Sequence, residues 1–515
     1  MGVVVRQSIK GSIVNYAGAF IGFLTTFFIL TNFLTEEEIG LTRVLLESAM
    51  LVAALAQLGT TASIVRYFPY FKNKEKKHHG FLGFSVLIPF VGAVVFCTLY
   101  VLLRQPIVLF FSQNSARFIE YFYYVIPLAV FFIYIGVFET YSSVLQRIVV
   151  PRFVREVGIR VMAVAVYLLW AFRVVSFDTF ILLFVLMYGI AAIMNLVYVL
   201  ALKDYSFKPD FSVVRKPLRK NFIYYTMFLF AAAIGGTITA KIDTFMVSSK
   251  LGLAQTGVFT IAYFMAVIID IPYRSLNMIS MPIASAHLKN KNYKEVQHLY
   301  KKVSLNQLIA GGLLFVLIWI NIDSIFQILP NGDKYVGGKY VVLFIALSRL
   351  IDSGFNFGLS ILSLSKYYYY YLFFIFFLSG LGICTNLILI PIYDISGAAL
   401  ATLISFVIYN ALVMLIVYKK MKISPFSLSQ LKLACVILGL LGINFVLSLL
   451  GINFGNIITY KFDNQIVDFK VHLIADIVIR SLIILSIGGF AVIKLKLSED
   501  VDRLWGMVKM KVFFR

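Results

Sequence analysis

Charged and polar side chains stand inside long apolar segments of this chain, at spacings that align them on single helix faces. The first such face lies in the segment 41–68 and carries Arg43, Glu47, Gln57 and Thr61. Ionisable side chains are costly in hydrocarbon and normally face the interior of a helix bundle or a water-filled cavity. This face therefore predicts a polar cavity wall.

Two further segments carry faces of the same kind. In the segment 338–363 the face consists of Arg349, Asp352, Ser353, Asn356, Ser360 and Ser363. In the segment 220–248 the face consists of Thr226, Thr237, Lys241, Thr244 and Ser248. Asp243 points the opposite way, so Lys241 and Asp243 cannot simply neutralise each other. A single Ser or Thr often bonds only to its own backbone, but a face with six aligned polar residues favours a cavity lining.

Three acid–base pairs have helical spacing inside apolar segments, namely Asp270 with Arg274, Arg349 with Asp352, and Asp476 with Arg480. Two interpretations are open for each pair, since the charges could neutralise each other so that the helix inserts, or could line a cavity. Arginine presents a planar fork of donors that matches phosphate oxygens, so an arginine-rich cavity fits a phosphate-bearing substrate. The predicted substrate-binding residues are Arg43, Glu47, Gln57, Lys241, Arg274, Arg349 and Asn356. The predicted ion-coupling residues are Asp270, Asp352 and Glu47, because each shares a face with an arginine.

Motifs for common enzymatic chemistry are absent from the sequence. There is no G-x-x-x-x-G-K-[S/T] phosphate loop, no G-x-G-x-x-G that opens a helix, and no His or Cys cluster at metal-ligand spacing. Cys97, Cys384 and Cys435 lie inside apolar segments without paired spacing, which predicts small packing residues. We therefore expect no enzyme, no catalytic residue, no metal and no cofactor. Energy for transport would come from an ion gradient (H⁺ or Na⁺), the membrane potential or removal of product.

Apolar segments of membrane-spanning length fill most of the chain. It has 515 residues, of which 61% are hydrophobic, and a mean hydropathy of +0.90. A helix needs roughly 20 apolar residues to cross a bilayer, and about fourteen segments meet that requirement. They lie near 8–33, 41–68, 80–103, 118–143, 153–172, 176–201, 220–248, 254–282, 303–329, 338–363, 368–393, 397–418, 428–449 and 471–493. The predicted fold class is an all-α polytopic membrane protein without a soluble domain.

Lysine and arginine fall almost entirely in every second loop, beginning with Arg6 and Lys10 before the first span. This asymmetry predicts that both termini are cytoplasmic. The formal net charge of +22 lies next to membrane spans, so contact with anionic lipids explains it better than nucleic-acid binding does. The first apolar run is too long for a cleavable signal peptide, and we expect it to stay as a span.

An internal repeat relates the two halves of the chain. The segments "LTEEEIGLTRV" and "LGLAQTGVFTIAY" align so that Gly40 corresponds to Gly257, 217 residues later. Two six-helix lobes follow, and they are parallel repeats around a central cavity because each contains an even number of spans. The predicted divisions are an N-lobe at 1–202, a cytoplasmic linker at 203–220, a C-lobe at 221–420, and two extra helices with a basic cytoplasmic tail at 421–515.

Three segments resemble the oligosaccharide flippases of bacterial polysaccharide biosynthesis, the Wzx-type branch of the multidrug/oligosaccharidyl-lipid/polysaccharide exporter superfamily. They are "KIDTFMVSSKLGLAQTGVFTIAYFM" at 241–265, "PIYDISGAALATLISFVIYN" at 391–410 and "LTEEEIGLTRVLLE" at 34–47. The resemblance covers the whole chain. It implies a MATE-like fold that transfers undecaprenyl-diphosphate-linked oligosaccharide across the bacterial inner membrane by alternating access. The product would be O-antigen, capsule or exopolysaccharide, with polysaccharide polymerase machinery as a partner.

The resemblance also bears on single residues and on competing functions. It implies basic cavity residues for the sugar diphosphate, and the family's aspartate in the 241–265 motif matches Asp243. Multidrug exporters of the superfamily usually stop at twelve spans and have acidic cavities, which argues against that function here. Lipid II flippases have arginines in the first span, whereas this chain has no basic residue between Lys10 and Glu36. A membrane polysaccharide polymerase or ligase is a further alternative, but it would need large loops on the far side.

Overall fold

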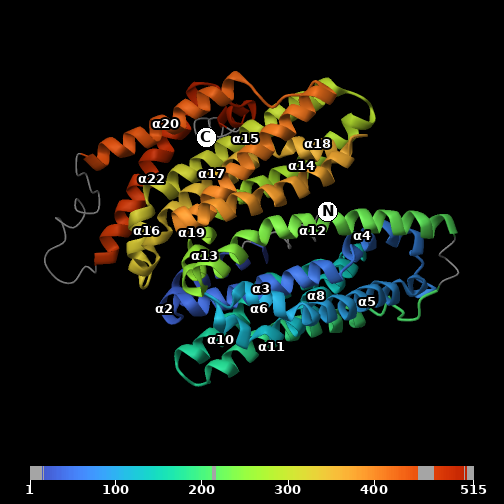
Figure 1. Ribbon diagram of the computed structural model, residues 1–515. Coiled ribbons are helices and arrows are strands. Elements are labelled where there is room, and N and C mark those ends of the chain that lie inside the picture. The colour runs from blue at the N-terminus through green and yellow to red at the C-terminus, as the bar shows by residue number, and fades with distance from the viewer. Residues whose placement is uncertain (1–13, 16, 211–215, 450–468, 504, 507–515) are drawn as a thin grey trace, which may run out of the picture. The chain divides into compact units, whose positions relative to one another are not determined.

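The protein is all-helical in the computed structural model, which describes residues 14, 15, 17–210, 216–449, 469–503, 505 and 506. No β-strand occurs in these ranges, as the predicted fold class requires. The chain divides into two compact units, Met1–Thr260 and Ile261–Arg515, drawn from blue to green and from yellow to red in Figure 1. The predictions that rest on Arg6 and Lys10 lie outside the described residues. The predicted lobe boundary at 203–220 stays a prediction.

The first unit is built around α3 (Glu36–Ala56), much of which is buried. This helix packs against α5 (Phe81–Leu102), α8 (Val125–Val144) and α12 (Lys216–Leu251), and α8 packs in turn against α11 (Phe177–Ala201). The other elements of this part are η1 (Thr25–Leu30), α2 (Thr31–Phe33), α4 (Thr60–Phe71), η2 (Lys77–Gly80), α6 (Arg104–Phe111), α7 (Ala116–Glu120), η3 (Phe122–Tyr124), α9 (Val149–Phe153), η4 (Val154–Gly158) and α10 (Ile159–Ala171).

Local signals fix both ends of α3. At its start Thr35 and Glu38 form a capping box, in which each side chain accepts a hydrogen bond from the other residue's backbone N–H, at 3.3 Å and 3.0 Å. At its end Leu58 and Gly59 adopt φ angles of 48° and 70°, and α4 begins directly after them. The predicted span 41–68 lies within Glu36–Phe71, which is long and apolar enough to cross a membrane, but a left-handed turn divides it into two helices.

The second unit is centred on α17 (Lys339–Phe355), which packs against α15 (Tyr293–Ile320) and α19 (Tyr369–Met421). α13 (Leu253–Ala266) runs across the boundary between the units along the chain. The remaining elements are η6 (Val267–Ile269), α14 (Asp270–Lys289), α16 (Ile322–Ile328), η7 (Gly332–Gly338), α18 (Phe357–Leu364), α20 (Leu428–Leu449) and α22 (Phe469–Lys494).

The 53 residues of α19 form a helical hairpin. A straight helix of this length would extend about 80 Å, far more than a bilayer core of about 30 Å. The chain reverses at Asp394, whose φ and ψ are 51° and −136°. Across the turn the hydroxyls of Thr385 and Ser405 lie 2.9 Å apart, and a Cβ at Gly397 would lie 2.1 Å from the carbonyl oxygen of Leu389. These contacts agree with two predicted spans, 368–393 and 397–418.

The described residues contain ten helices long and apolar enough to cross a membrane, or eleven if α17 and α18, bent by 41°, form one span. The exact count of fourteen is not confirmed. α19 counts once although it contains two predicted spans, and the predicted span 8–33 is described only from residue 14 onward. The predicted span 153–172 is interrupted by the π-helical turn η4, which leaves α10 with 13 residues.

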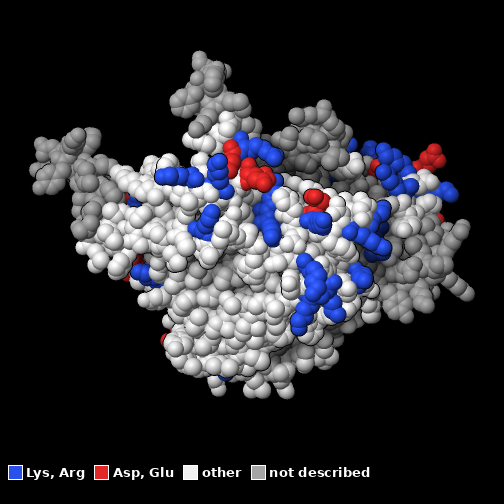
Figure 2. Space-filling view, turned by 90° about the horizontal axis from the view of Figure 1, so that it is seen from above, with Lys and Arg blue, Asp and Glu red and all other residues white. Residues whose placement is uncertain are grey.

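Exposed apolar side chains mark the faces that lipid must cover. On α11 they recur every three or four residues and are between 43% and 60% exposed: Leu182, Leu186, Ile190, Ile193 and Val197. The space-filling view shows a broad area without charged side chains, while Lys and Arg gather elsewhere on the same face (Figure 2). A contiguous apolar surface of this kind fits a bilayer and not water. The multi-pass architecture is thus visible at the level of single helix faces.

Two glycines that the predicted repeat aligns pack closely on backbone within the first unit. A Cβ at Gly40 would lie 1.9 Å from the carbonyl oxygen of Leu253, and a Cβ at Gly257 would lie 2.0 Å from that of Glu36. Leu253 is also 217 residues after Glu36, the offset that relates the glycines. The two residues on which the glycines pack are thus related by the same offset as the glycines themselves. Only a residue without a side chain allows this approach.

We predict that Gly40→Val and Gly257→Val each destabilise the protein by about 2 kcal/mol, because the new side chain overlaps a backbone carbonyl that cannot move independently. Thermal unfolding of the purified protein in detergent measures the effect. Gly236→Val is the matched control, since a Cβ at this helical glycine meets no atom within 4 Å. Equal unfolding midpoints for all three variants would contradict the packing described for this junction.

Candidate functional site

Three ionisable side chains meet between α3 and α12, and we call them the Glu47 cluster: Arg43, Glu47 and Lys241. The Nη2 atom of Arg43 lies 2.6 Å from Oε1 of Glu47, one helical turn away. The Nζ atom of Lys241 contacts the other carboxylate oxygen of Glu47. The Glu47 side chain is 1% exposed, whereas Arg43 and Lys241 are 20% and 18% exposed. The cluster is a buried carboxylate held between two cations.

The charges of the Glu47 cluster do not cancel. Two cations on one carboxylate leave a formal charge of +1, and both cations keep some exposed surface. Lys241 Nζ has a second contact with Sδ of Met50, at 3.5 Å. Lys241 contacts an acid on another helix, Glu47 of α3. Its contact is not with Asp243, which was predicted to lie on the opposite face of α12. An anionic ligand could therefore approach Arg43 and Lys241 without removing Glu47.

Gln57 lies apart from this cluster at the C-terminal end of α3. Its amide packs on Gly136 of α8, where an added Cβ would lie 3.0 Å from Nε2 of Gln57. Its Oε1 accepts a hydrogen bond of 3.5 Å from the Thr61 hydroxyl. The predicted common face assumed one helix through residue 68. The turn at Leu58 and Gly59 breaks that periodicity, so Thr61 does not continue the face of Arg43 and Glu47.

A second group lies between helices of the second unit, and we call it the Asp352 cluster: Tyr263, Asp270, Arg349, Asp352, Asn356 and Asn410. Asp352 accepts hydrogen bonds from the side-chain amides of Asn356 at 3.3 Å and Asn410 at 3.2 Å. Asn356 stands in the break between α17 and α18, which frees its side chain to turn back toward Asp352. The cluster therefore joins α17 to the second arm of α19.

Arg349 is held mainly by aromatic groups. Its Nη2 donates to the Tyr263 hydroxyl at 3.2 Å, and its guanidinium lies 5.7 Å and 5.2 Å from the ring centres of Tyr263 and Phe406. Arg349 and Arg274 are the charged neighbours of Asp270. Arg274 itself is exposed, so the structure places it at the edge of this group. These ring contacts orient the Arg349 guanidinium.

Tyr263, Phe406 and Asn410 were missed as site residues, because each is a single polar or aromatic residue in an apolar segment. Only Asn410 offered a signal in the sequence, because its polar side-chain amide lies inside a predicted membrane span. Conversely, some members of the predicted faces bond locally. Ser353 and Ser363 donate to the carbonyl oxygens of Leu350 at 3.0 Å and Ser360 at 2.7 Å. Their hydroxyls are satisfied by their own helices.

The predicted pair Asp476 and Arg480 on α22 forms an ion pair of 3.0 Å. Arg480 also donates to Oδ1 of Asn444 on α20, at 3.2 Å. Asp476 is 3% exposed and Arg480 is 13% exposed. This pair joins the two C-terminal helices, which favours the interpretation that its charges neutralise each other within the helix.

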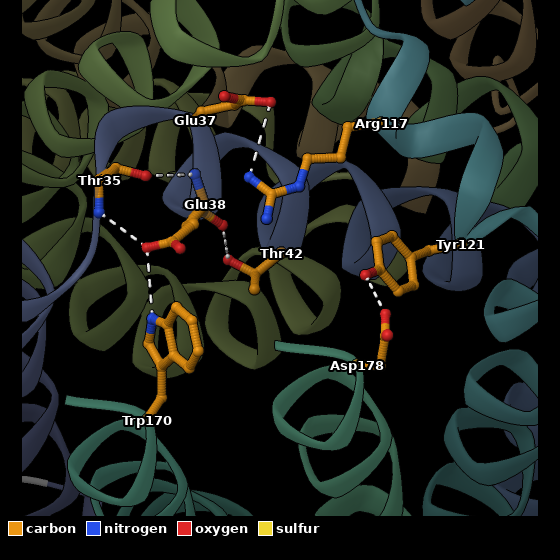
Figure 3. A network of polar contacts seen from close by, with 8 residues as sticks. All are labelled: Thr35, Glu37, Glu38, Thr42, Arg117, Tyr121, Trp170 and Asp178. Carbon is orange, nitrogen blue, oxygen red and sulfur yellow. Dashed lines mark hydrogen bonds and ion pairs between the residues drawn. The ribbon is translucent and has the colours of Figure 1, made fainter. Parts of the chain in front are cut away.

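A polar network holds the beginning of α3 in the first unit (Figure 3). Glu38 Oε2 accepts from the backbone N–H of Thr35 at 3.0 Å and from Nε1 of Trp170 at 3.4 Å. Glu37 pairs with Arg117 of α7 at 3.7 Å. The figure also shows Thr42 bonded to the Glu38 carbonyl and Tyr121 bonded to Asp178. α3 is thereby tied to segments on either side, which limits how far its charged residues can shift.

An apolar cavity of about 480 Å³ lies in the second unit between α15, α17 and α20. Its wall consists almost entirely of aliphatic and aromatic side chains, including Leu308, Leu350, Phe355, Phe426 and Ile437. Such a cavity suits a hydrocarbon chain. Among the described residues, no group of three or more His, Cys, Asp or Glu side chains is arranged to hold a metal ion.

The apolar helices and the ionisable clusters within them define a multi-pass membrane protein, and solved structures match its fold. A "Lipid II flippase MurJ, inward closed conformation" is 13% identical, with a TM-score of 0.69 over 95% of this chain and 99% of that one. A "multidrug resistance MATE family transporter of the MOP superfamily" is 13% identical, with a TM-score of 0.60 over 82% of this chain and 98% of that one. A transporter of the same superfamily from Pyrococcus furiosus is also 13% identical, with a TM-score of 0.54 over 82% and 95%. At these identities the matches show the fold alone.

The chain belongs to the polysaccharide biosynthesis protein family, whose model matches residues 4–287, more than half of the sequence. No curated protein matches the chain. The recognised family and the MATE-like fold are thus confirmed. The matched segment contains Arg43, Glu47, Lys241, Asp270 and Arg274, whereas Arg349, Asp352 and Asn356 lie beyond it.

We predict that Glu47→Gln lowers the free energy of unfolding by about 3 kcal/mol, because it leaves two partly buried cations without their carboxylate. Asp323→Asn is the matched control, since Asp323 pairs with Lys339 at 2.6 Å but is 67% exposed. Its loss should cost less than about 1 kcal/mol. Unfolding midpoints in detergent compare the two variants. Equal small shifts would contradict the buried-pair description of the Glu47 cluster.

Proposed function

We propose that this protein is a flippase that moves undecaprenyl-diphosphate-linked oligosaccharide from the cytoplasmic to the periplasmic leaflet by alternating access. The carrying observation is the Glu47 cluster, which holds an excess of positive charge inside the apolar helices. The partly exposed side chains of Arg43 and Lys241 suit an anionic diphosphate. The Asp352 cluster, with Arg274 included, has two acids and two arginines and therefore no net charge. Of the two clusters, only the Glu47 cluster has an excess of positive charge.

The apolar cavity supports a lipid-linked cargo. Its wall carries almost no polar surface, which suits a polyprenyl chain and suits a sugar poorly. α20, one of the two helices beyond the predicted twelve-span core, supplies Leu433 and Ile437 to this wall. In our proposal the charged clusters bind the diphosphate and the cavity accommodates part of the hydrocarbon tail.

Ion coupling is a further part of this proposal. Asp270, Asp352 and Glu47 are carboxylates within apolar helices, where gain or loss of a proton or sodium ion would change the local charge by one unit. Asp352 accepts two amide hydrogen bonds and has Arg349 as a charged neighbour, so its charge would influence how Arg349 is held. We propose an H⁺ or Na⁺ gradient as the energy source, with no other cofactor.

The setting of the proposal follows from the loop charges. The protein would lie in the bacterial inner membrane with both termini in the cytoplasm. Its partners would be the lipid-linked oligosaccharide, anionic membrane lipids and polysaccharide polymerase machinery. The fold shared with MurJ does not favour lipid II as cargo, because a structural similarity at 13% identity does not indicate which substrate is bound. The same holds for a multidrug substrate.

We predict that deletion of the gene stops surface polysaccharide and traps its lipid-linked precursor on the inner leaflet. Complementation with Arg349→Glu should leave export more than tenfold below wild type, since a lost interaction of about 1.4 kcal/mol already corresponds to tenfold. Analysis of lipid-linked sugars, together with the amount of inserted protein, measures both results.

The control for this experiment is Arg104→Glu, which reverses an exposed charge outside both clusters. It should export normally. Transport by purified protein in vesicles, with and without H⁺ and Na⁺ ionophores, tests the coupling. Full export by Arg349→Glu would contradict diphosphate recognition by this residue, and transport that is indifferent to both gradients would contradict the coupling.

A further inference from the structure

A cavity of about 350 Å³ lies in the first unit where three loops meet, and it shares no residue with either charged cluster. The loops follow α4, α8 and α11, and all three are on the side predicted to be cytoplasmic. Its lining consists of Phe68, Lys72, Lys74, His78, Val144, Leu145, Gln146, Arg147, Leu202 and Asp204. The volume falls in the range of small-ligand sites.

The cavity is positively charged. Lys72, Lys74 and Arg147 supply three positive charges and Asp204 one negative charge, which leaves a formal charge of +2 with His78 neutral. None of the three basic side chains forms an ion pair with another described residue. Three cations without a fixed partner around one hollow form a site for an anion, because their mutual repulsion falls when an anion binds.

The loops around the cavity are held in place by specific contacts. Nδ1 of His79 lies 2.9 Å from Oδ2 of Asp210, and the Asp210 N–H donates to the His79 carbonyl at 3.0 Å. Gly80 has a φ of 66°, and a Cβ there would lie 1.8 Å from the carbonyl oxygen of Lys208. The Tyr141 hydroxyl donates to the Asp204 carbonyl at 3.2 Å. The loop after α11 is thus fixed at three points.

Strained backbone surrounds the same cavity. Lys77, His78 and His79 all have left-handed φ angles, between 46° and 52°, and so does Gln146 at 61°. Such conformations cost of order 1 kcal/mol each for residues other than glycine and concentrate at functional sites. This strain is independent of the charge argument.

His78 closes one wall of the cavity. It is 1% exposed, and its ring packs on Phe68 with 5.0 Å between the ring centres. Nδ1 accepts a hydrogen bond of 3.2 Å from the Asn73 N–H, so in the neutral ring the proton is on Nε2. Nε2 has no hydrogen-bond partner among the described residues. His78 therefore adds a buried aromatic ring to the wall beside the three cations, while its Nε2 atom is inaccessible.

We propose that this cavity binds a phosphate group, either in the headgroup of an anionic lipid or free in solution. Basic pockets next to membrane helices on the cytoplasmic side are suited to such headgroups. A charge of +2 matches a phosphate with one or two negative charges, and the Arg147 guanidinium offers the paired donors that phosphate oxygens accept. This site does not depend on the proposed cargo, since it uses none of the residues assigned to transport.

The test compares the triple variant Lys72→Gln, Lys74→Gln, Arg147→Gln with a control of equal charge change, Lys289→Gln, Lys291→Gln, Lys294→Gln. The control lysines are exposed residues of the second unit on the same predicted side. One arm measures binding of inorganic phosphate to the full-length protein in detergent. The other arm starts from protein in vesicles of phosphatidylcholine mixed with phosphatidylglycerol. Native mass spectrometry then counts the phosphatidylglycerol molecules that stay bound to the protein.

We expect binding in at least one arm to fall more than tenfold in the triple variant and to stay at the wild-type level in the control. Loss in the lipid arm identifies a headgroup, and loss in the phosphate arm identifies a free anion. Asp204→Asn should bind more tightly, because it removes the only negative charge and leaves the backbone bond to Tyr141 intact. Equal binding by the triple variant and the control in both arms overturns the proposal, and so does weaker binding by Asp204→Asn.

Discussion

The structure depends on the way the buried carboxylate of Glu47 is paired inside an apolar bundle. A carboxylate that is 1% exposed is tolerated because Arg43 and Lys241 reach it from α3 and α12, and this requirement fixes the relation of the two helices. The capping box at Thr35 and the close approach at Gly40 hold α3 from its other end. Packing and charge therefore restrain the same helix. A shift of α3 would disturb both the ion pairs of Glu47 and the packing at Gly40.

Much of the fold follows from periodicity. Apolar length predicts the helices, and the spacing of charges on helix faces predicts that Arg43, Glu47 and Lys241 point inward. The repeat offset, read from Gly40 and Gly257, is reproduced in their reciprocal packing. Periodicity fails where the helix breaks. Gln57 and Thr61 lie at a left-handed turn, and such a turn needs only two residues, too few to disturb an apolar pattern over a whole span.

Hydrogen-bond partners on different helices are the second feature that cannot be predicted from a single sequence. Asp352 is bonded by Asn410, 58 residues later, and Arg349 by Tyr263, 86 residues earlier. Helical spacing pairs residues within one turn and therefore suggested Arg349 for Asp352. The loop cavity around His78 was likewise hidden, because its lining comes from three separate loops. In our proposals the charged residues within helices serve transport, and those around the loop cavity bind a phosphate at the membrane surface.

The central claim is that the charged clusters face water inside the membrane, and thiol accessibility tests it most directly. In a protein with Cys97, Cys384 and Cys435 replaced by alanine, single Lys241→Cys and Arg349→Cys variants would be treated with a charged maleimide, with Leu186→Cys on the lipid-facing stripe as the control. We predict that the first two thiols react and that the control does not. Unreactive thiols at 241 and 349, in folded protein treated from both sides of the membrane, would contradict the account.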